Sequence, residues 1–189
     1  NGLYNYRTSV SLMALSAAAG TSAFMLWGEE RLLANLYLAR VGPQAIPRKS
    51  TALRTSRRTA GEAIARPLDS EGQPTCISIS ETGSDEAIME ELAVKPAGVI
   101  WWSELAAALA QARKRYSGGL KQLLAELFDA AGQTRTHKLR DESRAIRIEN
   151  PCPHIMAATT VAWLREQIGE WDLLGGFLSR FLYVFGEHK

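Results

Sequence analysis

The sequence is poor in cysteine and has no long apolar run. Its two cysteines, Cys76 and Cys152, lie far apart and match neither the paired spacing of a zinc site nor the cysteine framework of a small secreted domain, so we expect two buried thiols. The most apolar stretch, residues 10–27, is diluted by Ser, Thr, Gly and Ala and lacks the roughly 18 uninterrupted apolar residues that a membrane-spanning helix needs. No secretory signal peptide is recognisable either. These absences favour a cytoplasmic protein without a membrane span.

An excess of charge of either sign is also missing. The chain has 189 residues, with 22 Lys and Arg against 20 Asp and Glu, which gives a formal net charge of +2. This balance argues against nucleic-acid binding through overall charge, although a local basic patch is compatible with it. The length and a hydrophobic share of 46% are typical of a single globular domain over residues 1–189. Because the sequence starts at Asn1 without an initiating Met, we expect it to be a segment of a longer protein.

Apolar runs alternate with helical periodicity along most of the chain. Short apolar runs bounded by Gly, Pro or Asn are typical of buried strands, whereas apolar residues three and four positions apart favour helices. Strands alternating with helices predict an α/β fold with a mostly parallel sheet covered on both faces, in three layers. The expected order is helix 7–24, strand 36–41, helix 49–66, strand 75–80, helix 84–94, strand 99–102, helices 104–115 and 120–131, a hairpin of 134–139 and 144–148, strand 153–158, helix 161–168 and strand 181–185.

Residues 42–51 lie where a phosphate-binding loop is expected, between the strand 36–41 and the helix 49–66. In such loops, backbone N–H groups and the helix N-terminus surround the phosphates, a lysine reaches the outer phosphates and a hydroxyl completes the magnesium shell. Lys49 and Ser50 supply the last two groups. The loop therefore predicts ATP and Mg²⁺ as ligands, with Ser50 as a ligand of the metal.

The loop departs from the full pattern G-x-x-x-x-G-K-[ST]. Arg48 occupies the position of the second glycine, Gly42 lies one residue too early, and two prolines remove two N–H groups. A turn followed by a helix that a serine or threonine caps is the alternative interpretation. The predicted nucleotide-binding residues are Gly42, Arg48, Lys49, Ser50 and Thr51.

A carboxylate follows the strand 99–102. Nucleotide hydrolysis needs an acid at the end of a neighbouring buried strand, where it holds the water of the metal or orients the attacking water. Glu104 is in that place, while Ser103 occupies the position that usually carries Asp, so metal binding would fall to Ser50 with waters. We predict Glu104 as the group that positions the water or acts as general base. An acid that stabilises the first turn of its own helix is the alternative.

Two further residues fit phosphoryl transfer. Thr159 ends the strand 153–158 and is predicted to lie near the γ-phosphate. Arg180 lies between two aromatic residues, shortly after a pair of glycines, and is predicted to meet the charge that develops in the transition state. The alternative for Arg180 is stacking on those aromatics or pairing with Asp172.

Taken together, these segments resemble an uncharacterised family of P-loop ATPases encoded near primases in phages, plasmids and other mobile elements, which is similar to replicative helicase motors. The resemblance implies ATP, Mg²⁺, a RecA- or AAA+-like three-layer domain, and a homo-oligomeric ring or filament in which Arg180 reaches a neighbour's nucleotide. The block 179–181 also looks like the arginine-finger segment of minichromosome-maintenance helicases. The likeness extends from about Leu12 to Val184 and is carried by residues 35–38, 48–53, 103–104, 116, 118–120, 150–151 and 176–181.

The remaining candidates are weaker. The histidines His137, His154 and His188 have no acid or cysteine at ligand spacing, which argues against a metal site. The basic residues 135–140 of the predicted hairpin are either a solvated face or a contact for single-stranded DNA. We expect the five tryptophans to be core residues and not stacking platforms, since all but Trp171 lie within apolar periodic segments; they are Trp27, Trp101, Trp102, Trp163 and Trp171.

The sequence thus predicts an ATP-binding, magnesium-dependent P-loop ATPase domain of a mobile-element replication protein that acts with DNA and a primase. The alternative is a binding module that holds a nucleotide, or only a partner, on a P-loop-like scaffold without turnover.

Overall fold

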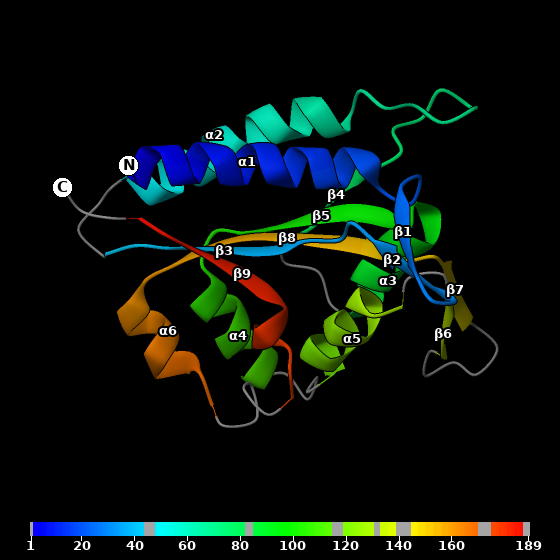
Figure 1. The fold of residues 1–189 in the computed structure, drawn as a ribbon. Helices are drawn as coiled ribbons and strands as arrows, with labels where there is room; N and C mark the ends of the chain where they lie inside the picture. Colours follow the sequence, from blue (N-terminus) through cyan, green and yellow to red (C-terminus); the bar gives the residue numbers. More distant parts are fainter. Residues whose placement is uncertain are drawn as a thin grey trace.

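The computed structural model shown in Figure 1 describes residues 2–43, 48–81, 85–114, 119–130, 133–138, 145–169 and 175–186. Within these residues the helices and strands alternate much as the sequence predicts. Their order is α1 (Gly2–Ala19), β1 (Phe24–Trp27), β2 (Glu30–Leu33), β3 (Tyr37–Val41), α2 (Arg48–Ile64), β4 (Ile77–Ile79), α3 (Asp85–Val94), β5 (Ala97–Trp102), α4 (Leu105–Lys114), α5 (Gly119–Phe128), β6 (Thr134–Lys138), β7 (Ala145–Glu149), β8 (Cys152–Thr159), α6 (Val161–Gln167), the 3₁₀ turn η1 (Leu178–Arg180) and β9 (Phe181–Phe185).

Five strands form one parallel sheet in the order β4-β5-β8-β3-β9. Two antiparallel hairpins, β1–β2 and β6–β7, lie outside it. The mostly parallel sheet and the α/β class predicted from the sequence are confirmed, and so is the hairpin at 134–148.

Helices cover both faces of the sheet (Figure 1). From β3 the chain crosses to β4 in one direction along the sheet, and then returns through β5 and β8 to β9 in the other direction. Right-handed crossovers therefore place the helix that follows β3 on one face and the later helices on the opposite face. Figure 1 shows this arrangement, with α1 and α2 above the sheet and α3 to α6 below it.

The alternation of side chains along the strands builds one apolar core on each face. In β3, Leu38 belongs to the upper cluster together with Met13 of α1, whereas Tyr37 belongs to the lower cluster. Trp101 and Ile100 of β5 divide in the same way. Because the central strands are buried on both faces, their sequences are mostly apolar runs, as expected for a parallel sheet, with Arg40 in β3 and His154 in β8 as buried exceptions.

The predicted first helix, residues 7–24, is wrong at its C-terminal end. The helix ends at Ala19, because Gly20 adopts a positive φ of 49° that terminates it. The residues that follow, Phe24–Trp27, form strand β1, and Gly28 with a φ of 63° turns the chain into β2. The aromatic and aliphatic run therefore forms a hairpin and does not extend the alanine-rich helix.

The prediction for the tryptophans is confirmed for two of them and wrong for two others, and Trp171 lies outside the residues that the structure describes. Trp101 and Trp102 are buried in β5. Trp27 is 71% exposed on the hairpin, and Trp163 is 44% exposed on α6. Both exposed residues lie in elements without a buried residue, because all four residues of β1 are exposed and α6 buries none. Within the described residues, no helix combines the length and the apolarity needed to cross a membrane.

Candidate functional site

Four strands of the sheet end at one edge. Val41 of β3 pairs with Thr159 of β8 on one side and with Phe185 of β9 on the other. Trp102 of β5 pairs with Ala157, two residues before the end of β8. The segments that follow these strands therefore emerge at the same edge, where parallel α/β sheets bind their ligands.

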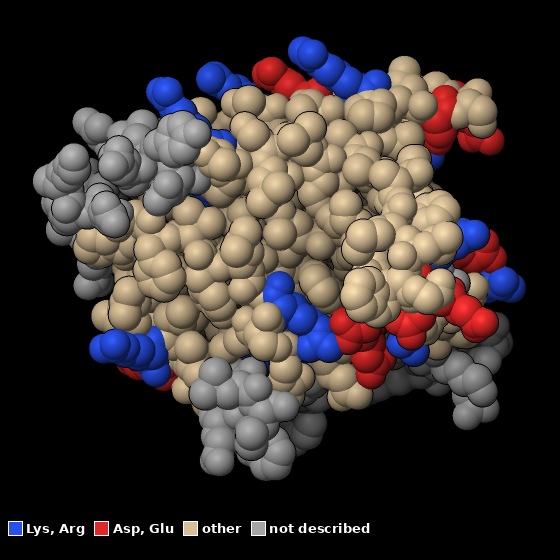
Figure 2. Space-filling view, viewed as in Figure 1, with Lys and Arg blue, Asp and Glu red and all other residues tan. Residues whose placement is uncertain are grey.

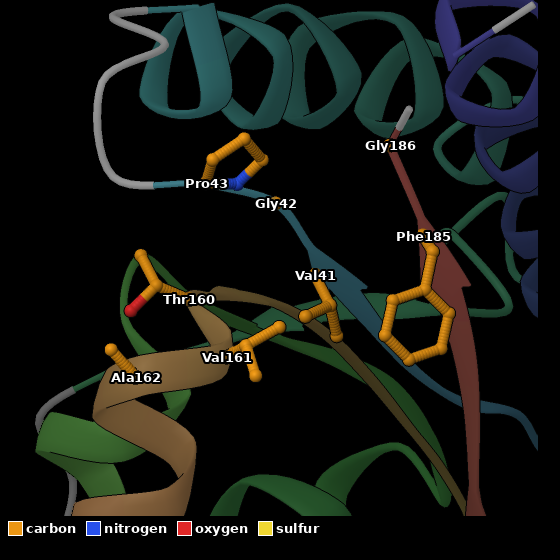
Figure 3. Close-up of a pocket in the computed structure, with 8 residues that line it drawn as sticks. All are labelled: Val41, Gly42, Pro43, Thr160, Val161, Ala162, Phe185 and Gly186. Carbon is orange, nitrogen blue, oxygen red and sulfur yellow. The ribbon is translucent and has the colours of Figure 1, made fainter. Parts of the chain in front are cut away.

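A hollow lies at this edge, where the chain leaves β3 and β8 toward opposite faces. After β3 it continues to α2 above the sheet, and after β8 it enters α6 below the sheet. Such a divergence opens a crevice between two neighbouring strands. The hollow has a volume of about 310 Å³ and is shown in Figure 3; its lining residues are Val41, Gly42, Pro43, Thr160, Val161, Ala162, Phe185 and Gly186.

Backbone hydrogen bonds hold the rim of this hollow. The Gly42 N–H donates to the Thr159 carbonyl at 3.2 Å, and the Gly186 N–H donates to the Val41 carbonyl at 2.9 Å. The hydroxyl of Thr160 accepts from the Trp163 N–H at 3.0 Å and so caps α6. The wall itself is largely aliphatic and aromatic, with Val161 and Phe185 on either side of Val41 in Figure 3.

The structure describes the predicted nucleotide-binding residues only in part. Gly42 lines the hollow, and its contact with a nucleotide stays a prediction. Helix α2 begins at Arg48, so Lys49, Ser50 and Thr51 lie in its first turn, as the sequence predicted. The side chains of these helical residues, and residues 44–47 of the loop, lie outside the part of the chain that the structure describes. Their roles therefore stay predictions.

Glu104 stands at the predicted edge, directly before α4. It is half-buried, and its carboxylate accepts from the Ala106 N–H at 3.3 Å. Glu104 thus lies at the cap position just before the first turn of α4, one residue outside the turn that the alternative considered from the sequence gave it, and its carboxylate still stabilises that end of the helix. Glu104 is not among the residues that line the hollow.

Thr159 is fully buried at the end of β8, with its hydroxyl 3.5 Å from the Thr160 carbonyl. The structure brings the next residue, Thr160, to the hollow. Thr159 contributes its backbone carbonyl to the rim.

A carboxylate that the sequence reasoning missed lies beside Ser103. Glu81 accepts the Ser103 N–H at 2.7 Å and the Ser103 hydroxyl at 2.6 Å on the same oxygen. Both residues are exposed. Glu81 follows β4, the strand next to β5, so an acid does stand at the position where the sequence lacked an Asp. The sequence could have pointed to Glu81, because this acid directly follows the predicted strand 75–80.

Arg180 lies at the amino-terminal ends of the strands, opposite the end of the sheet where the hollow lies. It precedes β9, whose length of five residues separates it by roughly 16 Å from the hollow. Its guanidinium donates to Asp129 through Nε at 3.2 Å and through a second, shorter contact, and to the Gly176 carbonyl at 2.6 Å. The hydrogen bond with Asp129 raises the pKa of Arg180. Arg180 is thus paired with Asp129. The alternative partner, Asp172, lies outside the described residues. Arg180 does not reach the hollow of its own chain.

A buried arginine that the sequence did not single out lies next to the hollow. Arg40 is 2% exposed and donates to the Ser9 hydroxyl at 3.0 Å, the Ser56 hydroxyl at 2.8 Å and the Tyr6 carbonyl at 2.8 Å. No acid in the described ranges forms an ion pair with it. Burial lowers the pKa of Arg40 to about 10. These bonds tie α1 and α2 to β3 just before Val41.

Tyr6 links this network to the hollow. Its ring lies 5.2 Å from the Arg40 guanidinium carbon, a cation–π distance. Its hydroxyl donates to the Val41 carbonyl at 3.5 Å. A Cβ on Gly186 would lie only 2.3 Å from the same hydroxyl oxygen, so the close approach of Tyr6 requires glycine there.

No group of three or more His, Cys, Asp or Glu side chains that could hold a metal ion occurs among the residues that the structure describes. Mg²⁺ needs no such cluster, because it usually takes one or two protein carboxylates together with substrate phosphates and waters. Comparison with models of known protein families finds no match, and none of the curated proteins matches the sequence.

Proposed function

We propose that this chain is a P-loop nucleotide-binding domain that binds ATP with Mg²⁺ and hydrolyses it. One observation carries the proposal: the hollow at the carboxyl edge of β3, β8 and β9 adjoins the loop that leads into α2, the helix that begins with Arg48, Lys49 and Ser50.

The start of α2 suits the phosphates. The helix has 17 residues, so its first turn presents free N–H groups and the positive end of a full helix dipole. A lysine and a hydroxyl in that turn are the side chains that phosphate-binding loops use. Arg40 adds a buried positive charge beneath α2, through its bond to Ser56. An anion is therefore the ligand that this end of the site favours.

The hollow suits the rest of the nucleotide. Its volume of about 310 Å³ is at the lower limit of small-molecule sites, and its wall combines apolar side chains with backbone groups. Val161 and Phe185 offer flat or aliphatic surface to a base or a ribose. We infer that the base or ribose occupies the hollow and that the triphosphate extends toward Lys49.

The donor set at the neighbouring strands fits Mg²⁺. Glu81 supplies a carboxylate and Ser103 a hydroxyl within 2.6 Å of each other, and both are exposed to solvent. Oxygen ligands of this kind are those that Mg²⁺ prefers. With Ser50, they are the residues that would hold the metal, which in turn would neutralise phosphate charge.

Turnover depends on Glu104. A carboxylate at the end of β5 is placed to orient a water molecule, and we propose this role for Glu104. Its bond to the Ala106 N–H must then loosen when the nucleotide binds.

A binding module without turnover is the second candidate. Two contacts favour it, because both predicted catalytic side chains already have partners within the chain. Glu104 caps its own helix, and Arg180 pairs with Asp129. Neither group has to change its contacts in a domain that only holds the nucleotide.

A role in replication of mobile elements, with a primase and single-stranded DNA, is proposed from the resemblance alone. The β6–β7 hairpin that would contact DNA buries Ile146 and Ile148 and exposes Arg147. Arg147 pairs with Glu149 at 2.8 Å, which reduces the positive charge that this strand offers. DNA binding through the hairpin should therefore be weak and sensitive to salt.

Calorimetric titration with ATP and Mg²⁺, combined with an ATPase assay, tests the proposal. We expect Lys49→Ala to abolish binding and Glu104→Gln to abolish turnover while binding persists. Arg66→Ala is the matched control, because Arg66 is exposed just beyond the other end of α2 and its loss changes the net charge by the same amount. Equal binding in Lys49→Ala and Arg66→Ala contradicts the proposal. Binding without turnover in the wild-type chain selects the second candidate.

A further inference from the structure

The hairpin of β1 and β2 is separate from the main sheet. Its two strands form a sheet of their own and pack mainly against each other. A two-stranded hairpin without further packing is only marginally stable in water. Figure 1 shows the hairpin at the end of the domain away from α6, and Figure 2 shows a largely uncharged surface in the same place. The hairpin therefore gains stability from a partner that packs against it.

The turn of the hairpin determines which side chains share a face. Gly28 and Glu29 form a two-residue turn between Trp27 and Glu30, which pair with each other. Gly28 has a positive φ of 63°, as glycine does in the first position of such a turn. Because side chains alternate along a strand, two pairs lie on one face, namely Trp27 with Glu30 and Met25 with Leu32.

The opposite face of the hairpin has partners within the domain. It carries the pairs Phe24 with Leu33 and Leu26 with Arg31. The Arg31 guanidinium carbon lies 4.6 Å from the centre of the Phe24 ring, a cation–π distance. Leu33 packs against the upper core cluster. Arg31 is the only cation between residues 24 and 33, so the hairpin places its positive charge on the side away from Trp27.

The face with Trp27 is uncovered and acidic at one end. Met25, Trp27 and Leu32 are 59%, 71% and 41% exposed, and we call these three residues the Trp27 face. Glu30 lies opposite Trp27, and Glu29 lies next to it in the turn. Neither acid forms an ion pair with another residue in the described ranges. Tryptophan and methionine are enriched in the buried centres of protein interfaces, so this surface has the composition of a binding site.

We propose that the Trp27 face binds a basic amphipathic helix of a partner protein. The apolar side of the helix covers Met25 and Leu32, and one of its lysines or arginines lies over the indole of Trp27, beside Glu30. A cation in this place makes a cation–π contact and an ion pair at the same time. Side chains one helical turn apart are separated by about 5–6 Å, close to the spacing of roughly 7 Å between alternate residues of a strand. One face of a helix therefore matches Met25 and Trp27 together.

The two acids favour this occupant over a lipid surface and over a second copy of the chain. An anionic bilayer repels Glu29 and Glu30, and a charged turn enters hydrocarbon only at a cost. A second copy that packed its own Trp27 face here would add two more acids and no cation, because Arg31 lies on the other face. A basic helix supplies the charge that this end of the hairpin lacks.

A pair of synthetic peptides tests the proposal on the full chain. Both form amphipathic helices with leucines on one side; the first has lysines beside the leucines and the second has glutamates. Calorimetric titration should show that the lysine peptide binds at least tenfold more tightly. Trp27→Ser and Met25→Ser should each weaken its binding at least tenfold. Leu26→Ser is the matched control and should bind like the wild-type chain, because Leu26 is 63% exposed on the same strand but lies on the opposite face.

The three substituted residues are exposed, so the thermal unfolding of the variants should stay close to that of the wild-type chain. Charge reversal tests the part that the acids play. The double variant Glu29→Lys with Glu30→Lys should prefer the glutamate peptide, a reversal that an apolar surface without charge selection would not show.

Several results overturn the proposal. They are equal affinity for the two peptides, no binding of either peptide, and an equal loss of affinity in Leu26→Ser and Trp27→Ser. Cosedimentation with vesicles of phosphatidylcholine and phosphatidylserine that Trp27→Ser abolishes would assign the face to lipid instead. Self-association that the same variant abolishes would assign it to a second copy. All these measurements are made without nucleotide, so their outcome is independent of the proposed ATP site.

Discussion

Ser103 donates both its backbone N–H and its hydroxyl to the same carboxylate oxygen of Glu81, at 2.7 and 2.6 Å. Ser103 follows β5 and Glu81 follows β4, so the contact joins the ends of two neighbouring strands. The contact places the carboxylate of Glu81 beside Ser103, the residue that occupies the position where P-loop ATPases usually have aspartate. This relationship changes the expected metal ligands from Ser50 alone to a set that includes Glu81.

Glu81→Gln should weaken the magnesium-dependent part of ATP binding. The amide keeps the size of the side chain but loses the negative charge that attracts Mg²⁺, so we expect at least a tenfold loss of ATP affinity with Mg²⁺ and no change without it. Calorimetric titrations with and without Mg²⁺ measure both values. Glu62→Gln, at an exposed position of α2, is the control. A loss of affinity that is the same with and without Mg²⁺ would show that Glu81 does not act on the metal.

Arg40→Lys should destabilise the fold more than Arg40→Met. Lysine keeps a buried charge but cannot reach Ser9, Ser56 and the Tyr6 carbonyl together, since it lacks the planar fork of arginine. We expect a loss of about 2–4 kcal/mol in the free energy of unfolding for lysine. Methionine removes the charge and its desolvation cost, which offsets part of the lost hydrogen bonds. Urea unfolding of the two variants decides the order; a more stable lysine variant would contradict the account of this network.

His154 should make stability depend on pH in a defined direction. It is fully buried in β8, and burial lowers its pKa to about 3. Its Nδ1 accepts from the Leu36 N–H at 3.2 Å, and its Nε2 faces the Cys152 sulfur at 3.5 Å. Burial raises the pKa of the Cys152 thiol to about 12, so the thiol stays neutral in this range. The folded ring therefore stays neutral below pH 6.5, where the unfolded chain takes up a proton.

It follows that stability falls as the pH falls from about 6.5 toward 3. Between pH 7 and pH 5 the single histidine accounts for a loss of about 2 kcal/mol in the free energy of unfolding. His154→Asn keeps an acceptor for the Leu36 N–H and removes the titration, so its stability should change much less over this range. Urea unfolding at several pH values measures the difference. Parallel pH profiles for the two proteins would rule out the assignment.

The strands of the sheet could be predicted because burial on both faces makes β3, β5 and β8 mostly apolar runs. The hairpin at the N-terminal side was missed for a related reason. Phe24–Trp27 is also an apolar run, but it is exposed, and sequence alone did not distinguish an exposed run from the end of a buried helix. Only Gly20 signalled the break.

The site could be predicted only in part. The place of the proposed phosphate-binding loop between β3 and α2 could be predicted from local order along the chain, since it needs one strand and the helix after it. The contact between Glu81 and Ser103 depends on β4 lying beside β5, and the pair of Arg180 and Asp129 joins residues 51 positions apart. Such contacts depend on strand order, which the alternation of elements does not specify. Arg40 was overlooked because its charge interrupts an apolar strand, and its burial becomes clear only from the two helices that cover it.

A variant that fills the hollow tests the central claim most directly. Ala162 lines the hollow at the start of α6, and Ala162→Trp places a large ring in a space of about 310 Å³. Calorimetric titration with ATP and Mg²⁺ should show binding to the wild-type chain and at least a tenfold loss of affinity in the variant, with little change in thermal unfolding of the free proteins. Equal affinity in the two proteins, or no binding to the wild-type chain, would contradict a nucleotide site at this edge of the sheet.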